Sequence, residues 1–321
     1  MTPGPCWPDG GIEMAILGVV VNPTAGKGRA EGEGAKVPAL LRARGHEVID
    51  LSAPDLAGAH TSARQAVVDG VDALIVAGGD GMTHLGVNVV AGTTLPLGII
   101  PLGTGNDVAR ILGLPRHNLE AAVGAIERAL AEGPRVIDAV RVTDTAHSMS
   151  EWYAGVLSAG FDAAVNAKAN RLTWPRGGSV YVRALFQEIT RYRPYGFEID
   201  IDGELAWQSA AALVAVANGS DIGGGMHIAP DASLDDGQLD VVIGGPISTA
   251  TLLTVFPRVY RGTHISHPAV TVLRGREVTV RARPDLGLTP PDAHTDGERV
   301  GPLPLSCRCE PGALRVLAAQ P

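Results

Sequence analysis

The chain has 321 residues, a length that favours two domains, and its 45% hydrophobic and 19% charged residues are typical of a folded globular protein. Its net charge of −8 argues against a nucleic-acid binder as a whole, and its three cysteines cannot form a disulfide framework. A reducing cytoplasm is therefore the expected compartment. No apolar run approaches the roughly 20 residues that a membrane-spanning helix needs.

The first part of the chain alternates short apolar runs with amphipathic segments. Residues 1–13 lack the basic residues of a signal peptide, so we expect a disordered extension before a domain spanning 14–140. The predicted strands of this domain are 15–21, 46–51, 73–77 and 96–100, and its predicted helices are 35–44, 61–68, 82–90, 107–112 and 119–131. The alternation predicts an α/β domain with a parallel sheet covered by helices on both faces.

The pattern changes after about residue 135 and becomes richer in strands. Strands are predicted at 135–142, 153–161, 197–202, 212–218, 239–244, 269–273 and 277–282, with helices at 179–191 and 248–259. Mostly antiparallel strands with turn signals such as Asp202-Gly203 predict a β-sandwich-like second domain over 141–304. A last strand at 313–318 leads us to expect that residues 305–321 return to the first domain.

Three Gly-rich stretches each follow a predicted strand of the first domain: NPTAGKG (22–28), GGDGM (78–82) and PLGTGND (101–107). Ligands of parallel sheets bind beyond the carboxyl ends of the strands. Glycines let the backbone approach an anion, and amides at helix N-termini point towards it. Each stretch alone is also compatible with a simple turn or helix cap, but their convergence predicts one phosphate-binding site.

Two familiar nucleotide motifs are excluded by single residues. A P-loop needs glycine where Val21 stands and Ser or Thr where Gly28 stands. The dinucleotide fingerprint needs a third glycine where GKGRAE has Glu31 and GTGNDV has Val108. The phosphate site must therefore be of another kind.

Taken together, NPTAGKG, GGDG and PLGTGND resemble, in order and spacing, the catalytic domain of diacylglycerol kinases. This lipid kinase family includes bacterial soluble lipid kinases and the sphingosine and ceramide kinases. The resemblance continues through ANGSDIGGGMHIAPDASLDDGQLDVV (217–242) and TDGE (295–298), and covers about residues 15–318. It implies an ATP-binding α/β domain related to phosphofructokinases and NAD kinases, a β-rich domain, and a site in the cleft between them.

The resemblance implies that ATP is held by the three loops and the end of the second strand. The implied residues are Asn22, Pro23, Thr24, Ala25, Gly26, Ser52, Gly78, Gly79, Asp80, Gly81, Met82, Thr83, Gly103, Thr104 and Asn106. The chain departs from the family at Met82, where threonine is usual, and at Leu85, where an acid is common. A thioether cannot donate a hydrogen bond to a phosphate, so Met82 leaves nucleotide affinity and donor choice open, with Thr83 as a displaced hydroxyl.

Phosphoryl transfer needs the γ-phosphate positioned, its charge offset by Mg²⁺ and donors, and the attacking hydroxyl oriented or deprotonated. Asp80, beside the phosphate loop, could hold Mg²⁺ or the acceptor hydroxyl. The resemblance favours Glu298 as general base, with Asp296 close by. The alternative for TDGE is a hairpin turn with solvated acids.

The segment SLDDGQ (233–238) places acids beside a tight turn. Carboxylate and carbonyl oxygens suit hard cations. The resemblance implies a structural Mg²⁺ held by the Asp236 side chain and the carbonyls of Ser233 and Gln238. An ordinary acidic turn is the alternative.

The leading hypothesis is an ATP-dependent kinase that converts diacylglycerol to phosphatidic acid. A sphingoid base, ceramide or another lipid alcohol is the alternative acceptor, and a non-catalytic nucleotide- or lipid-binding regulator is the alternative function. The window 171–193 combines arginines with aromatic residues, which suits transient contact with the inner face of the membrane, although a solvated helix has the same pattern. The oligomeric state is open, with a homodimer as one option.

Overall fold

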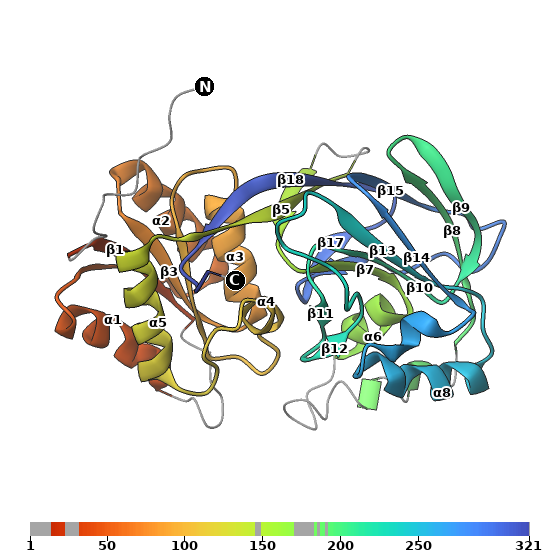
Figure 1. The fold of residues 1–321 in the computed structure, drawn as a ribbon, viewed down its shortest axis with the longest axis horizontal. Helices are drawn as coiled ribbons and strands as arrows, with labels where there is room; N and C mark the ends of the chain where they lie inside the picture. The colour runs from red at the N-terminus through yellow and green to blue at the C-terminus, as the bar shows by residue number, and fades with distance from the viewer. Residues whose placement is uncertain are drawn as a thin grey trace. The chain divides into compact units, whose positions relative to one another are not determined.

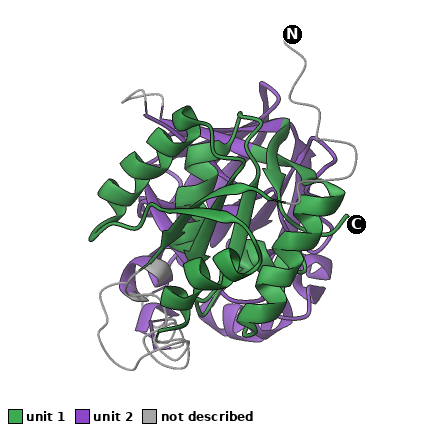
Figure 2. Cartoon of the chain, turned by 90° about the vertical axis from the view of Figure 1, so that its left-hand side faces the viewer, with its two compact units in different colours: residues 1–139, 311–321 green, residues 140–310 purple. Residues whose placement is uncertain are grey.

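The computed structural model describes residues 14–22, 32–144, 149–169, 183–184, 187–189 and 192–320. The chain divides into two compact units: unit 1 comprises 1–139 and 311–321, and unit 2 comprises 140–310 (Figure 2). The predicted extension 1–13, the loop residues 23–28 and most of the window 171–193 lie outside the described residues.

Unit 1 is an α/β unit in which strands and helices alternate along the chain (Figure 1). Its elements are β1 (Ile16–Val21), α1 (Glu33–Ala43), β2 (Glu47–Asp50), α2 (Leu56–Asp69), β3 (Ala73–Gly78), α3 (Asp80–Val90), β4 (Leu97–Pro101), α4 (Asp107–Ile111) and α5 (Leu119–Glu132). The strands pair in parallel in the order β2-β1-β3-β4. Helices α1 and α5 pack together against the sheet, and α2 and α3 form a second packed pair. The predicted parallel sheet with helices on both faces is confirmed.

The helices of unit 1 start and stop where their sequences supply caps. The Asp55 side chain accepts a hydrogen bond from the Gly58 amide at the start of α2, and Asn118 accepts one from the Ala121 amide at the start of α5. Gly70 ends α2 in the left-handed conformation, which costs glycine little because it has no Cβ. Strands β2, β3 and β4 each end shortly before the helix that follows them in the chain.

Unit 2 is built mainly from antiparallel strands. Its elements are β6 (Met149–Tyr153), β7 (Val156–Gly160), α6 (Phe161–Ala169), β8 (Tyr195–Ile201), β9 (Glu204–Ala211), β10 (Leu213–Ala217), β11 (Asp221–Ile222), β12 (Met226–His227), β13 (Leu239–Gly244), α8 (Thr249–Val259), the 3-10 helix η1 (Thr263–Ser266), β14 (Val270–Gly275), β15 (Glu277–Ala282), β16 (Ala293–Thr295) and β17 (Glu298–Gly301). β5 (Arg135–Asp144) and β18 (Leu305–Val316) run through both units.

Two sheets of unit 2 enclose its main core. One sheet has the order β14-β13-β10-β7-β16-β17, and the other contains β18-β15-β8-β9 with β5 and β6. Alternate residues of β10 face opposite sides: Val214 and Val216 pack between the sheets, whereas Ala215 and Ala217 pack towards the layer that holds α6 and α8. This period of two is what a strand buried on both faces requires. The predicted β-sandwich-like domain is confirmed.

Candidate active site

Asp80 connects two of the predicted loops of unit 1. Its Oδ2 accepts a hydrogen bond from the Asn106 amide at 2.9 Å, and its Oδ1 accepts one from the Asp107 amide at 2.7 Å. Asp80 therefore lies at the N-terminus of α4, where a helix dipole stabilises negative charge. Burial raises the pKa of Asp80, while these two amides and Arg110 oppose that shift.

The same two loops approach each other backbone to backbone. A Cβ on Gly103 would overlap the Cα of Gly79, and one on Gly105 would overlap Oδ2 of Asp80. The Asn106 side chain closes the loop by donating to the Gly103 carbonyl at 2.7 Å and accepting from the Gly103 amide at 3.1 Å. Only glycine allows this approach, so GGDGM and PLGTGND act as one preorganised platform.

A pocket beside this platform brings the first and second loops together with the end of β2. It encloses about 470 Å³ of empty space, open solvent included. Its lining residues are Val20, Val21, Asn22, Ala53, Pro54, Asp55, Leu56, Ala59 and Met82. The segment from Ala53 to Leu56 was not among the predicted contacts. Like the three Gly-rich loops, it follows a strand and precedes a helix, and this position could have indicated it.

The residues at and near the platform that could offer a hydroxyl to a phosphate differ in their exposure to solvent, and Met82 stands where the family has one. Met82 is buried at 2% exposure, and the neighbouring Thr83 is buried with its hydroxyl 3.5 Å from the Gly79 carbonyl oxygen. Thr104 is exposed at the loop surface. Ser52 accepts a hydrogen bond from the Val21 amide at 3.0 Å, which ties the end of β2 to β1. Thr104 is therefore the hydroxyl of the second and third loops that reaches solvent.

In unit 2, the TDGE turn separates two acids that are close in sequence. Asp296 and Gly297 adopt positive φ angles of 48° and 87°, which makes the tight hairpin turn between β16 and β17. Asp296 is 8% exposed, and its carboxylate accepts hydrogen bonds from the amides of Ala154 and Val156 at 3.3 and 3.2 Å. Glu298 is exposed. The turn thus buries one carboxylate as an anchor and presents the other.

The ANGSD segment meets the TDGE turn at the same place. Asn218 is fully buried. Its side-chain Nδ2 donates a hydrogen bond to the Ala154 carbonyl at 2.9 Å, and its backbone N–H donates one to the Gly155 carbonyl at 2.9 Å. Asp296 holds the amides on either side of Gly155. Two motifs that are far apart in sequence therefore fix one turn, between β6 and β7.

The predicted metal segment concentrates negative charge around Asp236. Its Oδ1 accepts a hydrogen bond from the Gln238 amide at 3.0 Å, and its Oδ2 pairs with Arg274. Burial raises the pKa of Asp240, Arg274 opposes the shift, and the charges of Asp236 and Asp231 add to it. The donors fit a cation in charge and chemistry, but here Arg274 supplies that cation and would have to release Asp236 before Mg²⁺ could bind.

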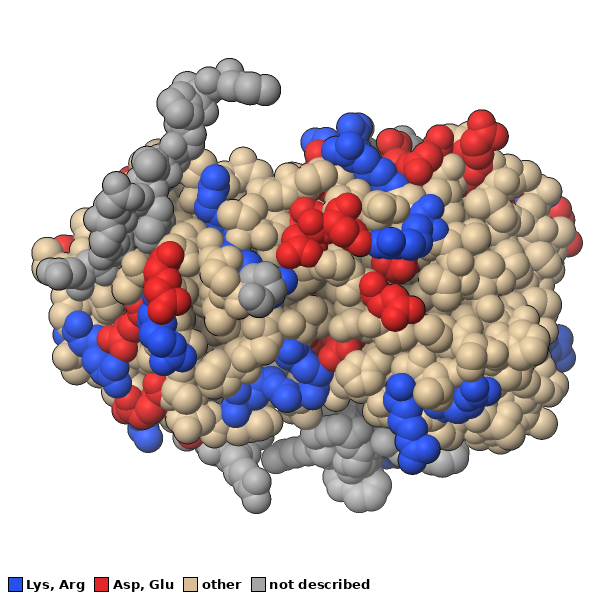
Figure 3. Space-filling view, in the orientation of Figure 1, with Lys and Arg blue, Asp and Glu red and all other residues tan. Residues whose placement is uncertain are grey.

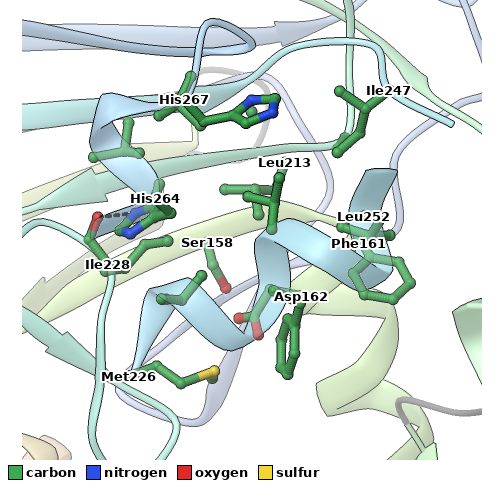
Figure 4. Close-up of a pocket in the computed structure, with 18 of the residues that line it drawn as sticks. Ser158, Phe161, Asp162, Leu213, Met226, Ile228, Ile247, Leu252, His264 and His267 are labelled. Carbon is green, nitrogen blue, oxygen red and sulfur yellow. Dashed lines mark hydrogen bonds between the residues drawn. The ribbon is translucent and has the colours of Figure 1, made fainter. Parts of the chain in front are cut away.

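Unit 2 also contains an apolar pocket that the sequence did not predict (Figure 4). It encloses about 840 Å³ of empty space, open solvent included. Strands β7, β10 and β13 and helices α6 and α8 supply most of its lining, including Phe161, Leu213, Val242, Leu252 and Phe256, and Met226 of β12 adds to it. His264 closes one side by donating from Nε2 to the Ile228 carbonyl at 3.0 Å, and burial lowers the pKa of this histidine.

The charged surface and the length of the helices bear on contact with membranes. On the face drawn in Figure 3, most of the surface is uncharged, and lysines and arginines lie next to acidic residues in several places. In the part of the chain that the structure describes, no helix is long and apolar enough to cross a membrane.

Two family models together match nearly the whole chain. The diacylglycerol kinase catalytic domain matches residues 17–142, which include all three Gly-rich loops. The YegS C-terminal NAD kinase beta sandwich-like domain matches residues 155–318, which include the ANGSD, DDG and TDGE segments. The match to the second model alone covers half of the chain.

Individual relatives agree with the family models. A diacylglycerol kinase of Mycobacterium tuberculosis is 35% identical over 95% of this chain and 96% of its own length. A probable YegS-like lipid kinase of Xanthomonas axonopodis is 31% identical over 78% of this chain and 80% of its own length. The crystal structure of a putative diacylglycerol kinase from Bacillus anthracis shares the fold, with a TM-score of 0.72, 22% identity and coverage of 95% and 97% of the two chains. The chain therefore belongs to the diacylglycerol kinase catalytic-domain family of lipid kinases.

Proposed function

We propose that this lipid kinase transfers the γ-phosphate of ATP to the hydroxyl of diacylglycerol and releases phosphatidic acid. The observation that carries the choice of acceptor is the apolar pocket of unit 2, whose lining suits hydrocarbon chains rather than a sugar or a nucleotide. The name of the 35% identical relative supports the same acceptor.

ATP is proposed to bind at the platform of unit 1. The peptide amides at the start of α3 suit phosphate oxygens, and the glycines of both loops permit close approach. The Asn106 and Asp107 amides at the start of α4 instead hold the Asp80 carboxylate in place. Asn22, Gly78 to Thr83, Gly103, Thr104 and Asn106 would provide the contacts, with the outer part of the nucleotide in the pocket lined by Asn22 and Met82. Pro23 to Gly26 and Ser52 complete the proposed set.

The proposed reaction assigns separate roles to the acids. The lipid oxygen bonds to the γ-phosphorus, the bond from that phosphorus to the bridging oxygen of ADP breaks, and the hydroxyl proton passes to the Glu298 carboxylate. Glu298 is suited to this role because it is exposed. Asp296 positions the turn that presents Glu298, and Asp80 fixes the phosphate platform.

Mg²⁺ is proposed as the companion of ATP, where it would offset the charge of the phosphates. A second, structural Mg²⁺ is proposed at Asp236 with the carbonyls of Ser233 and Gln238. The charges of Asp236 and Asp231 both act on Asp240, so negative charge gathers in this segment, and Mg²⁺ would bind there in place of Arg274.

The place of action follows from the acceptor. Diacylglycerol resides in a bilayer, so the kinase is proposed to work in the cytoplasm and to visit the inner face of the membrane transiently. A homodimer remains a separate proposal, to be checked by light scattering.

The acceptor is tested with γ-labelled ATP, Mg²⁺ and mixed micelles that contain diacylglycerol, ceramide or sphingosine. We expect labelled phosphatidic acid as the main product. Label on ceramide or sphingosine instead would show that one of these lipids, and not diacylglycerol, is the acceptor. The absence of any labelled lipid would contradict the proposal.

A variant of the pocket tests its part in acceptor binding. Ile247 lines the pocket and is half-buried, so Ile247→Trp should fill space and raise the KM for long-chain diacylglycerol more than for a short-chain analogue. Leu205→Trp, at an exposed position in β9 outside the pocket, is the matched control. Equal KM values for both variants would argue against the pocket as the acyl site.

A further inference from the structure

A serine stands on the pocket face of strand β7. All five residues of β7 are buried, and Leu157 and Ala159 pack into the core between the two sheets. Because side chains alternate along a strand, Ser158 faces the other way and lines the apolar pocket (Figure 4). Its neighbours along the same row of the sheet, in β10 and β13, are Ala215 and Val242, which also line the pocket. The hydroxyl therefore interrupts an apolar wall.

The Ser158 hydroxyl is buried without a hydrogen bond. The residue is 2% exposed, and its Oγ has no hydrogen-bond partner among the described residues. A buried hydroxyl that lacks a partner destabilises a protein, and nearly all such groups in folded proteins are paired. Since this hydroxyl belongs to the wall of a pocket, a ligand in the pocket can supply the partner.

The other polar side chains of the pocket offer different groups. Nε2 of His264 donates to the Ile228 carbonyl, so the buried Nδ1 of the neutral ring can only accept a hydrogen bond. Burial lowers the pKa of His264, which favours this neutral form. Asp162 is an acceptor when ionised, and His267 is only half-buried. Among the described lining residues, Ser158 is thus the deeply buried side chain with a hydrogen free to donate.

We propose that Ser158 is a specificity-determining residue that donates a hydrogen bond to an acyl carbonyl of the lipid acceptor. An acyl chain combines hydrocarbon, which suits the apolar lining, with a carbonyl oxygen that accepts a hydrogen bond. The inference rests on the proposed function, in which the pocket holds the acyl chains of diacylglycerol. A lipid with ether-linked chains has the same hydrocarbon but no carbonyl, so it would cover the hydroxyl without pairing it.

The test compares diacylglycerol with its dialkyl ether analogue of equal chain length, in mixed micelles with labelled ATP and Mg²⁺. The wild type should use the diacyl lipid with a kcat/KM about tenfold higher, because the ether lipid leaves Ser158 unpaired. In Ser158→Ala the preference should fall to about twofold or less, through a higher KM for the diacyl lipid, since this contact takes no part in the reaction itself.

The matched control is Ser306→Ala. Ser306 is half-buried in β18 and outside the pocket lining, so this variant should keep the wild-type preference for the diacyl lipid. Two mixed analogues, 1-alkyl-2-acyl and 1-acyl-2-alkyl glycerol, identify the carbonyl. The wild type should discriminate against one of them as strongly as against the dialkyl lipid.

Stability provides a measurement that does not depend on activity. Because Ser158 Oγ has no partner among the described residues, Ser158→Ala should have a free energy of unfolding no lower than that of the wild type. Ser306 accepts a hydrogen bond from the Thr279 hydroxyl at 3.3 Å, so Ser306→Ala should not be more stable than the wild type. A clear loss of stability in Ser158→Ala under urea would overturn the proposal, because the hydroxyl would then have a structural partner.

The failure of this inference differs from the failure of the proposed function. Wild-type protein that labels diacylglycerol, with the same preference over the ether lipid in Ser158→Ala, would overturn the role of Ser158 and leave the proposed function standing. Equal use of the two lipids by the wild type would do the same. Wild-type protein that labels neither lipid would contradict the proposed function and this inference with it.

Discussion

At the residue scale, the two acids of the TDGE turn lie in different environments. Asp296 and Glu298 are two positions apart, yet the first is buried and accepts two backbone hydrogen bonds while the second is exposed. A buried carboxylate that is already hydrogen-bonded is suited to hold structure, whereas an accessible one is suited to take a proton. Substitution of Glu298 should therefore affect the reaction rate, whereas substitution of Asp296 should affect the stability of the fold.

Glu298→Gln should lower kcat by roughly 10²–10⁴-fold, the usual contribution of a general base, because the amide cannot accept the hydroxyl proton. The KM for ATP should stay near the wild-type value. Steady-state kinetics with labelled ATP measures both constants, and an unchanged kcat would remove Glu298 from the proposed mechanism.

Asp296→Asn should instead lower the free energy of unfolding by about 1–3 kcal/mol, since the amide NH₂ would face the Ala154 or Val156 amide without a partner. Urea unfolding measures the change. Asp292→Asn is the control: Asp292 makes a surface ion pair with Arg299, whose loss should cost no more than about 1 kcal/mol. Equal losses in the two variants would show that Asp296 is not an anchor.

At the element scale, glycines decide how closely the loops of unit 1 approach. Gly103→Ala places a methyl group on the backbone of Gly79, which cannot move aside as a side chain could. We expect a loss of about 1–3 kcal/mol in stability and a raised KM for ATP. The control is Gly124→Ala inside α5, where the new methyl group would meet only Arg128 Nη1 at 3.7 Å, and where higher helix propensity should stabilise the protein by up to about 1 kcal/mol. Opposite signs for the two variants are the expected result.

The elements themselves were predictable to different degrees. The strands of unit 1 and the hairpin turn at Asp202-Gly203 are confirmed, because continuous apolar runs and turn residues are local signals. Helix α6 and strand β9 were not predicted. α6 is short, and its apolar residues are buried because they line the pocket, which a local sequence pattern does not reveal. Among the described strands, β9 lies at the edge of its sheet beside β8, so much of it is exposed and its apolar pattern is weak.

At the scale of the whole molecule, each unit has its own core, and ligands should stabilise the unit that binds them. ATP with Mg²⁺ at a hundredfold excess over its Kd should raise the free energy of unfolding of unit 1 by about 2.7 kcal/mol. Calorimetry with and without nucleotide measures the shift. Diacylglycerol analogues should act on unit 2 instead. A nucleotide-independent transition for unit 1 would contradict ATP binding at the platform.

The sequence by itself determined the family, the two-part architecture and the identity of the loop residues. These depend on local patterns: a period of two or of 3.6 in the apolar residues, glycines after strands, and short motifs with fixed spacing. Only the tertiary structure decided that Asp80 holds the start of α4, that Asp296 is buried while Glu298 is not, and that Arg274 pairs with Asp236. It also produced the apolar pocket of unit 2. Partners and burial arise from contacts between segments far apart in the chain, and no local pattern specifies which side chain meets which.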